Sequence, residues 1–133
     1  MFGTNGQTMT LIVLLVEDSQ TIRDNLIPAL EDLVGASVVK CVVGEAEAKL
    51  WLRSHSSWHL AVVDLFLENG SGLGVLGILQ SRQQRQNAVV LSNYATPEMK
   101  MQCAALGADR VFDKSTELDQ FLDYCNERSV EAG

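Results

Sequence analysis

The sequence is poor in proline and cysteine and has no long hydrophobic run, and each shortage excludes a class of protein. Two of the 133 residues are proline and 47% are hydrophobic, which excludes a disordered chain. No apolar stretch approaches the roughly 20 residues that a membrane-spanning helix needs. Three widely spaced cysteines, Cys41, Cys103 and Cys125, form neither a disulfide framework nor a metal-ligand pattern. Reduced thiols and a cytoplasmic location are therefore expected.

Basic residues are also scarce, with 10 Lys and Arg against 17 Asp and Glu and a formal charge of −7. A chain of this charge is not expected to bind nucleic acid or an anionic membrane by itself. Residues 1–10 lack the basic start and apolar stretch of a signal peptide. The predicted organisation is an N-terminal tail over 1–10, one folded domain over 11–127 and a frayed C-terminal tail over 128–133.

Hydrophobic patterning predicts strands and helices that alternate along the chain. Short connections between them imply right-handed crossovers and a parallel sheet with helices on both faces. The predicted fold class is therefore a three-layer, doubly wound α/β domain with a five-stranded sheet. Strands are predicted over 11–16, 36–43, 60–67, 88–92 and 110–114, and helices over 22–34, 45–54, 73–85, 97–106 and 117–127.

The central predicted strand, 60–67, is apolar at every position except Asp64. Such a strand is covered on both faces, and a buried carboxylate at its tail costs free energy unless it has a partner. In open α/β sheets, ligands bind at the carboxyl ends of the strands. Asp64 is therefore the first candidate for a functional residue.

Other predicted strands also finish in polar residues. Glu17 and Asp18 follow the first strand, Ser92 ends the fourth, and Lys114 ends the fifth. Because parallel strands end at one edge of the sheet, these groups are expected to converge on Asp64. Three neighbouring carboxylates need a cation to stay ionised, and oxygen ligands favour a hard ion such as Mg²⁺. A hydroxyl and an ammonium suit phosphoryl oxygens, so the pattern predicts a metal site beside a carboxylate that can accept a phosphate.

In these motifs the sequence resembles the receiver domain of two-component response regulators. The resemblance runs from Leu11 to Glu127 and implies a flavodoxin-like fold with strand order 2-1-3-4-5. It rests on the following motifs, in this order: Val16-Glu17-Asp18, Val63-Asp64-Leu65, Gly70-Ser71-Gly72, Leu91-Ser92 and Asp113-Lys114-Ser115.

The resemblance implies a role for each residue of the site. Asp64 would be the phosphoacceptor, supplied by a sensor histidine kinase or a histidine phosphotransfer protein. Asp18, Asp64 and the backbone carbonyl of Phe66 would hold Mg²⁺, and Glu17 would act mainly through water. Two further residues would handle the phosphate: Lys114 would bind it, and the hydroxyl of Ser92 would move toward it.

The resemblance also implies a switch rather than a turnover enzyme, one that promotes only its own phosphorylation and dephosphorylation. Output would pass to a partner protein through the fourth helix, fifth strand and fifth helix, and phosphorylation could drive homodimerisation. The chain departs from the family at Val111, where an aromatic residue is frequent, and at Glu68, where proline is common. Phe66 and Tyr94 flank the expected approach of water to the phosphate and predict slow self-dephosphorylation.

Alternatives remain open from the sequence. Taken alone, Asp64 could cap a turn, and Lys114 could be an ordinary surface residue. A Mg²⁺-dependent phosphate-ester hydrolase would also use a strand-end aspartate, but it favours a second aspartate where this chain has Phe66. A pseudo-receiver that serves only as a docking module would share the fold. A flavodoxin is disfavoured because Glu17 and Asp18 would repel the flavin phosphate.

Overall fold

A computed structural model describes residues 10–93 and 95–132 and shows a five-stranded parallel sheet. The strands lie in the order β3-β2-β4-β5-β6, which is 2-1-3-4-5 when they are counted along the chain, so the predicted fold class and strand order are confirmed. Their bounds are β2 Ile12–Val16, β3 Ser37–Val42, β4 Leu60–Val63, β5 Asn87–Ser92 and β6 Arg110–Asp113.

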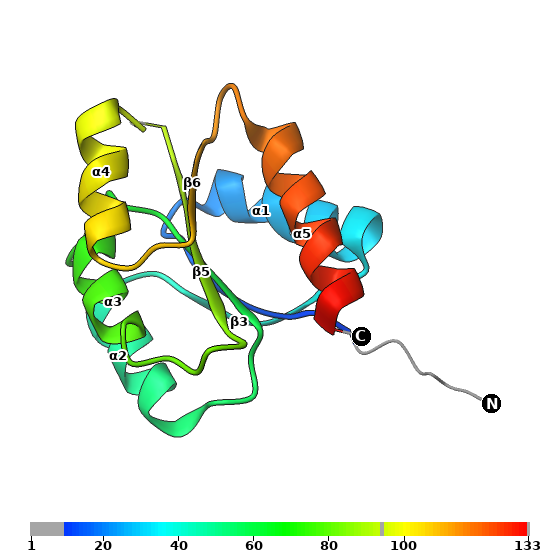
Figure 1. Ribbon diagram of the computed structural model, residues 1–133, viewed down its shortest axis with the longest axis horizontal. Coiled ribbons are helices and arrows are strands. Elements are labelled where there is room, and N and C mark those ends of the chain that lie inside the picture. The colour runs from blue at the N-terminus through cyan, green and yellow to red at the C-terminus, as the bar shows by residue number, and fades with distance from the viewer. Residues whose placement is uncertain (1–9, 94, 133) are drawn as a thin grey trace.

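Helices cover both faces of this sheet (Figure 1). One face carries α2, α3 and α4, and the other carries α1 and α5. No helix in the described part of the chain is both long and apolar enough to cross a membrane. The bounds are α1 Gln20–Ala29, followed directly by the π-helix η1 Leu30–Val34, then α2 Glu45–Ser54, α3 Gly72–Leu79, α4 Pro97–Ala105 and α5 Leu118–Ala132.

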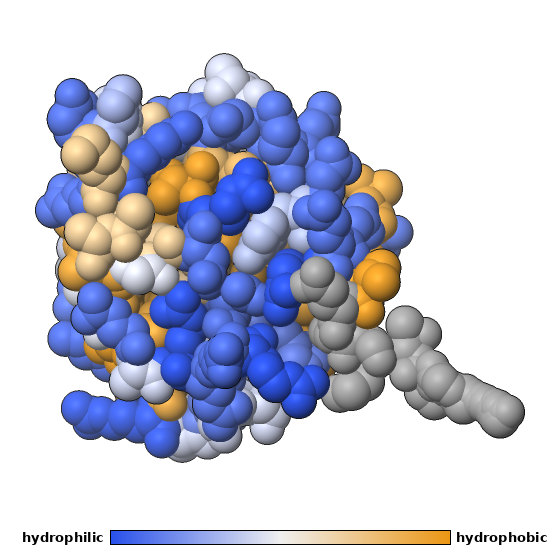
Figure 2. All heavy atoms as spheres, viewed as in Figure 1, coloured by the Kyte–Doolittle hydropathy of each residue, from blue (hydrophilic) through white to orange (hydrophobic). Residues whose placement is uncertain are grey.

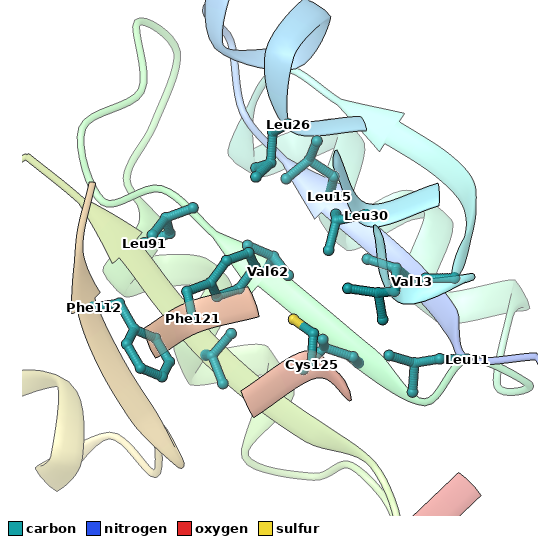
Figure 3. Packing of buried hydrophobic residues seen from close by; sticks show 14 residues of the cluster. Leu11, Val13, Leu15, Leu26, Leu30, Val62, Leu91, Phe112, Phe121 and Cys125 are labelled. Atoms are coloured by element: carbon teal, nitrogen blue, oxygen red, sulfur yellow. The ribbon is translucent and has the colours of Figure 1, made fainter. Parts of the chain in front are cut away.

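Each face of the sheet has its own hydrophobic core, because successive side chains of a strand point to opposite faces. In β2, Val13 and Leu15 belong to the core beneath α1 and α5, whereas Leu14 and Val16 belong to the core beneath α2, α3 and α4. Figure 3 shows the first of these cores, in which the rings of Phe112 and Phe121 meet edge to face at 5.7 Å. Outside these cores, the face in Figure 2 is mostly hydrophilic, with scattered hydrophobic patches.

Several helix ends follow from local sequence signals. Ser19 Oγ accepts a hydrogen bond from Ile22 N at the start of α1, and Thr96 Oγ1 accepts one from Met99 N at the start of α4. Pro28 lies in the last turn of α1, where it removes a helical hydrogen bond, and the wider π-helical turn follows it. Gly35 then ends η1 with φ 74°, a left-handed conformation that suits glycine.

Other element bounds differ from the sequence prediction. The central strand ends at Val63 rather than at residue 67, so Asp64 is the first residue of a loop, 64–71. Helix α3 ends at Leu79 rather than at residue 85, because the side chain of Arg82 donates to the Leu79 and Gln86 carbonyl oxygens and holds the chain in turns.

The last helix also differs from its prediction at both ends. Ser115 does not cap it, because its amide and hydroxyl both donate to Asp113 Oδ1 within a turn, and α5 begins at Leu118. The helix continues to Ala132 rather than ending at Glu127, since neither glycine nor proline interrupts residues 127–132.

Candidate functional site

The register of the parallel strands brings four of the predicted residues to the same edge of the sheet. Val16 pairs with Val63, so Glu17 and Asp64 follow neighbouring strands at the same level, and Asp64 N donates to the Val16 carbonyl oxygen at 2.9 Å. On the other side of β4, the Ser92 carbonyl oxygen accepts from Lys114 N at 3.0 Å.

Lys114 joins two of the carboxylates. Its Nζ lies 2.7 Å from Glu17 Oε1 and 3.4 Å from Asp64 Oδ1, and the side chains of Lys114, Glu17 and Asp64 are only 10%, 3% and 8% exposed. Burial strengthens these attractions because little water screens the charges. The other oxygen of Glu17, Oε2, accepts a hydrogen bond from Ser19 N at 3.1 Å. Both oxygens of Glu17 are therefore already engaged.

Asp64 has an unusual acidity for an aspartate. Burial raises its pKa from 3.8 to about 6, the Lys114 ammonium opposes the rise, and the Glu17 carboxylate adds to it. A backbone hydrogen bond from Phe66 N–H stabilises the charged form. The carboxylate is thus still mostly ionised at neutral pH, while it binds a proton more readily than a surface aspartate does.

The donor set fits a hard divalent cation. Glu17, Asp18 and Asp64 each offer a carboxylate oxygen, and these oxygens lie within 4.8 Å of one another. Mg²⁺ prefers oxygen ligands of this kind and usually keeps several waters, so it needs only one or two carboxylates from the protein. With Glu17 bound to Lys114 and Ser19, Asp18 and Asp64 are the carboxylates best able to contact an ion directly.

The remaining predicted residues take the following places. Ser92 is fully buried at the end of β5, and the side chain of Phe66 is 51% exposed in the 64–71 loop. Val111 packs with the core beneath α2, α3 and α4, whereas Phe112 belongs to the opposite core. Tyr94 lies outside the described residues.

Two contacts that shape the site were not predicted from the sequence. Glu45, the first residue of α2, accepts a hydrogen bond from Ser71 N at 2.8 Å, and its own N–H donates to the Asn69 carbonyl oxygen. Asp18 Oδ2 accepts from the backbone N–H of Glu68 at 2.6 Å. The only sequence signal for the first contact is the repeated glycine at 70, 72 and 74. Two of these glycines, 70 and 74, leave room for the side chain of Glu45.

The model of the response regulator receiver domain family matches residues 13–126 of the sequence. The chain belongs to this family. The match covers all five strands except the first residue of β2, and it includes most of α5 and every predicted site residue. A search of curated protein sequences gives no match.

Solved structures of receiver domains share this fold. A response regulator from Burkholderia pseudomallei is 27% identical, with a TM-score of 0.74, and the alignment covers 90% of this chain and 69% of that one. That structure is described as containing a phosphorylated aspartic acid, a calcium ion and citrate. A receiver domain of a Luxo repressor protein from Vibrio parahaemolyticus is 19% identical, with a TM-score of 0.77 and 93% of each chain covered. The latter similarity concerns the fold alone.

Proposed function

We propose that Asp64 accepts a phosphoryl group from a phosphohistidine and that this receiver domain thereby switches its protein contacts. The observation that carries the proposal is the position of Lys114, whose ammonium lies 3.4 Å from Asp64 within a group of three carboxylates, two of them buried. A cation beside a carboxylate nucleophile is suited to binding the phosphate that the nucleophile acquires. The aspartyl phosphate of the Burkholderia relative supports the same chemistry here.

In the proposed transfer, an oxygen of the Asp64 carboxylate attacks phosphorus as the nitrogen–phosphorus bond of phosphohistidine breaks. The histidine nitrogen keeps the electron pair of that bond, and an acyl phosphate forms on Asp64. Since the pKa of Asp64 is about 6, roughly nine-tenths of the carboxylate is ionised at neutral pH and ready to attack. Lys114 is placed to bind oxygens of the phosphoryl group as it arrives.

Asp18, Asp64 and the Phe66 carbonyl would hold Mg²⁺, with Glu17 acting through water because both of its oxygens have partners. The cation would neutralise negative charge on the transferred group. Lys114 would then exchange part of its contact with Glu17 and Asp64 for the phosphate. Ser92, at the end of the neighbouring strand, carries the hydroxyl that would follow the phosphate inward.

We infer that the output surface is formed by α4, β6 and α5. Lys100 of α4 forms an ion pair of 3.7 Å with Glu117, the residue before α5, so the two helices are linked next to Lys114. Met101 on α4 is 73% exposed, and Figure 2 shows weakly hydrophobic residues over that helix. Such a surface suits a partner protein or a second copy of the chain.

We infer that the protein acts as a cytoplasmic switch rather than as a turnover enzyme.

Intact mass after incubation with acetyl phosphate, with and without Mg²⁺, tests the proposal. Wild type should gain one phosphate only with Mg²⁺, and Asp64→Asn should gain none. Asp24→Asn, which alters an exposed carboxylate of α1, should label like wild type. Absence of labelling in wild type would favour a docking-only pseudo-receiver, and sustained turnover of p-nitrophenyl phosphate would favour the hydrolase.

A further inference from the structure

Asp18 is neutralised differently from the other two carboxylates of the site. Lys114 contacts Glu17 and Asp64, whereas Asp18 Oδ2 accepts a hydrogen bond from the backbone N–H of Glu68. The distance of 2.6 Å is shorter than the usual N–H···O range of about 2.7–3.2 Å, as expected for an acceptor that carries a full charge. The charge of Asp18 is therefore offset by the amide dipole of the 64–71 loop.

This amide is held in place from both ends of the loop. At one end, Asp64 N donates to the carbonyl oxygen of Val16, the last residue of β2. At the other end, Glu45 accepts from Ser71 N and donates its own N–H to the Asn69 carbonyl oxygen. Glu68 lies between these fixed points, so its N–H cannot simply follow the Asp18 carboxylate when that side chain turns.

We propose that the Glu68 amide competes with the divalent cation for Asp18 and so sets how tightly this receiver domain binds the ion. The inference rests on the proposed function, in which Asp18 is a metal ligand. Mg²⁺ requires its oxygen ligands at about 2.0–2.1 Å in near-ideal geometry. An amide hydrogen on the same carboxylate lowers the negative charge that it offers and repels the incoming cation.

The competition depends on residue 68 having a backbone N–H. Proline at this position would remove the donor, because its nitrogen carries no hydrogen. The hydrogen bond would then no longer stabilise the cation-free protein, while the cation-bound protein would lose nothing. Binding of the cation should therefore become tighter.

Two variants at one position separate the amide from the side chain. Glu68→Pro removes both the N–H and the carboxylate, whereas Glu68→Ala removes only the carboxylate and is the matched control. Calorimetric titration of the full chain with magnesium chloride should show Glu68→Pro binding about threefold to tenfold tighter than Glu68→Ala, the range for an ordinary hydrogen bond, because this one is exposed and water screens the charge of Asp18.

The wild-type protein provides a second measurement that needs no substitution. A ¹H–¹⁵N spectrum is recorded first with a chelator and then as Mg²⁺ is added. The resonance of the Glu68 amide proton should move to higher field, in step with the change in the Asp18 amide resonance. An unmoved Glu68 amide at saturating Mg²⁺, or a folded proline variant that binds no tighter than the alanine variant, would overturn the competition while leaving the proposed function intact. If the proline variant does not fold, the amide titration decides. Failure of wild type to bind Mg²⁺ would overturn both proposals.

Discussion

Lys114 and Glu17 form a buried ion pair, with 2.7 Å between Nζ and Oε1, although 97 residues separate them in the sequence. The same ammonium lies 0.7 Å farther from Asp64, the difference between 3.4 and 2.7 Å. Glu17 therefore does more than add negative charge for a cation. It also draws the lysine away from Asp64 and raises the pKa of Asp64.

The substitution Glu17→Gln tests this relationship. The introduced amide oxygen can still accept a hydrogen bond from Ser19, but the neutral side chain no longer attracts Lys114 or repels the Asp64 carboxylate. We expect the pKa of Asp64 to fall below about 6, but only part of the way toward its ordinary 3.8, because burial, the largest cause of the rise, remains. Titration of the Asp64 carboxyl carbon by ¹³C NMR, in the presence of a chelator, measures the change. An unchanged or higher pKa would show that Glu17 does not contribute to the raised pKa of Asp64.

Asp64 is also expected to reduce the stability of the fold. Its pKa is about 6 in the folded protein, against an ordinary 3.8, so the folded chain holds this proton more tightly than the unfolded chain does. The resulting cost is complete above pH 6, and it disappears as the pH falls through 6 toward 3.8. At neutral pH it amounts to about 1–3 kcal/mol.

Asp64→Asn should therefore raise the free energy of unfolding, measured with urea and a chelator at about pH 7.5, by on the order of 2 kcal/mol. Most of the gain should vanish at about pH 4.5, because the wild-type carboxyl is then protonated in the folded state. Asp24→Asn is the control and should show no such pH-dependent gain. An Asp64→Asn variant that is less stable than wild type at neutral pH would contradict the assignment.

The convergence of Glu17, Asp64 and Lys114 could be predicted from the sequence because it depends only on where the buried strands end. Parallel strands place their carboxyl ends at one edge of the sheet, whatever the details of the connections. The roles of these groups in phosphoryl transfer, by contrast, remain proposals.

The hydrogen bonds of the 64–71 loop could not be predicted in the same way. Glu45 reads in the sequence as an acidic residue that suits the start of a helix, and Glu68 as a solvated loop residue. Their contacts with Ser71 and Asp18 depend on how far the loop folds back over the sheet, which no local pattern specifies. Similarly, α3 ends early because the side chain of Arg82 donates hydrogen bonds to the carbonyl oxygens of Leu79 and Gln86. Helical periodicity in the sequence does not reveal these hydrogen bonds.

The close packing of Gly72 against the backbone of Asp64 gives a further prediction. A Cβ at this position would collide with the Asp64 carbonyl oxygen and the backbone of Leu65. Gly72→Ala should lower the free energy of unfolding by about 2–3 kcal/mol, as expected for overpacking beside rigid backbone.

Gly77, in the same helix, is the control, because a Cβ added there would have nothing within 4 Å. Gly77→Ala should instead stabilise the protein by about 0.5–1 kcal/mol. Equal effects of the two substitutions in urea unfolding would refute this packing.

Phe66 is expected to set the lifetime of the aspartyl phosphate. Phe66 is 51% exposed, and its backbone N–H bonds to the carboxyl group of Asp64, so the residue lies next to the proposed acceptor. A bulky apolar group there hinders the water that would attack the acyl phosphate. Phe66→Asn keeps the backbone donor and replaces the ring with a small polar group. Decay of the phosphorylated protein, followed by intact mass after the donor is removed, should become roughly threefold to tenfold faster, equivalent to about 1 kcal/mol of barrier.

Leu50→Asn is the control, because it also replaces an exposed apolar side chain, but on α2, and it should leave the decay unchanged. If Phe66→Asn decays at the wild-type rate, the ring does not control access of water to Asp64.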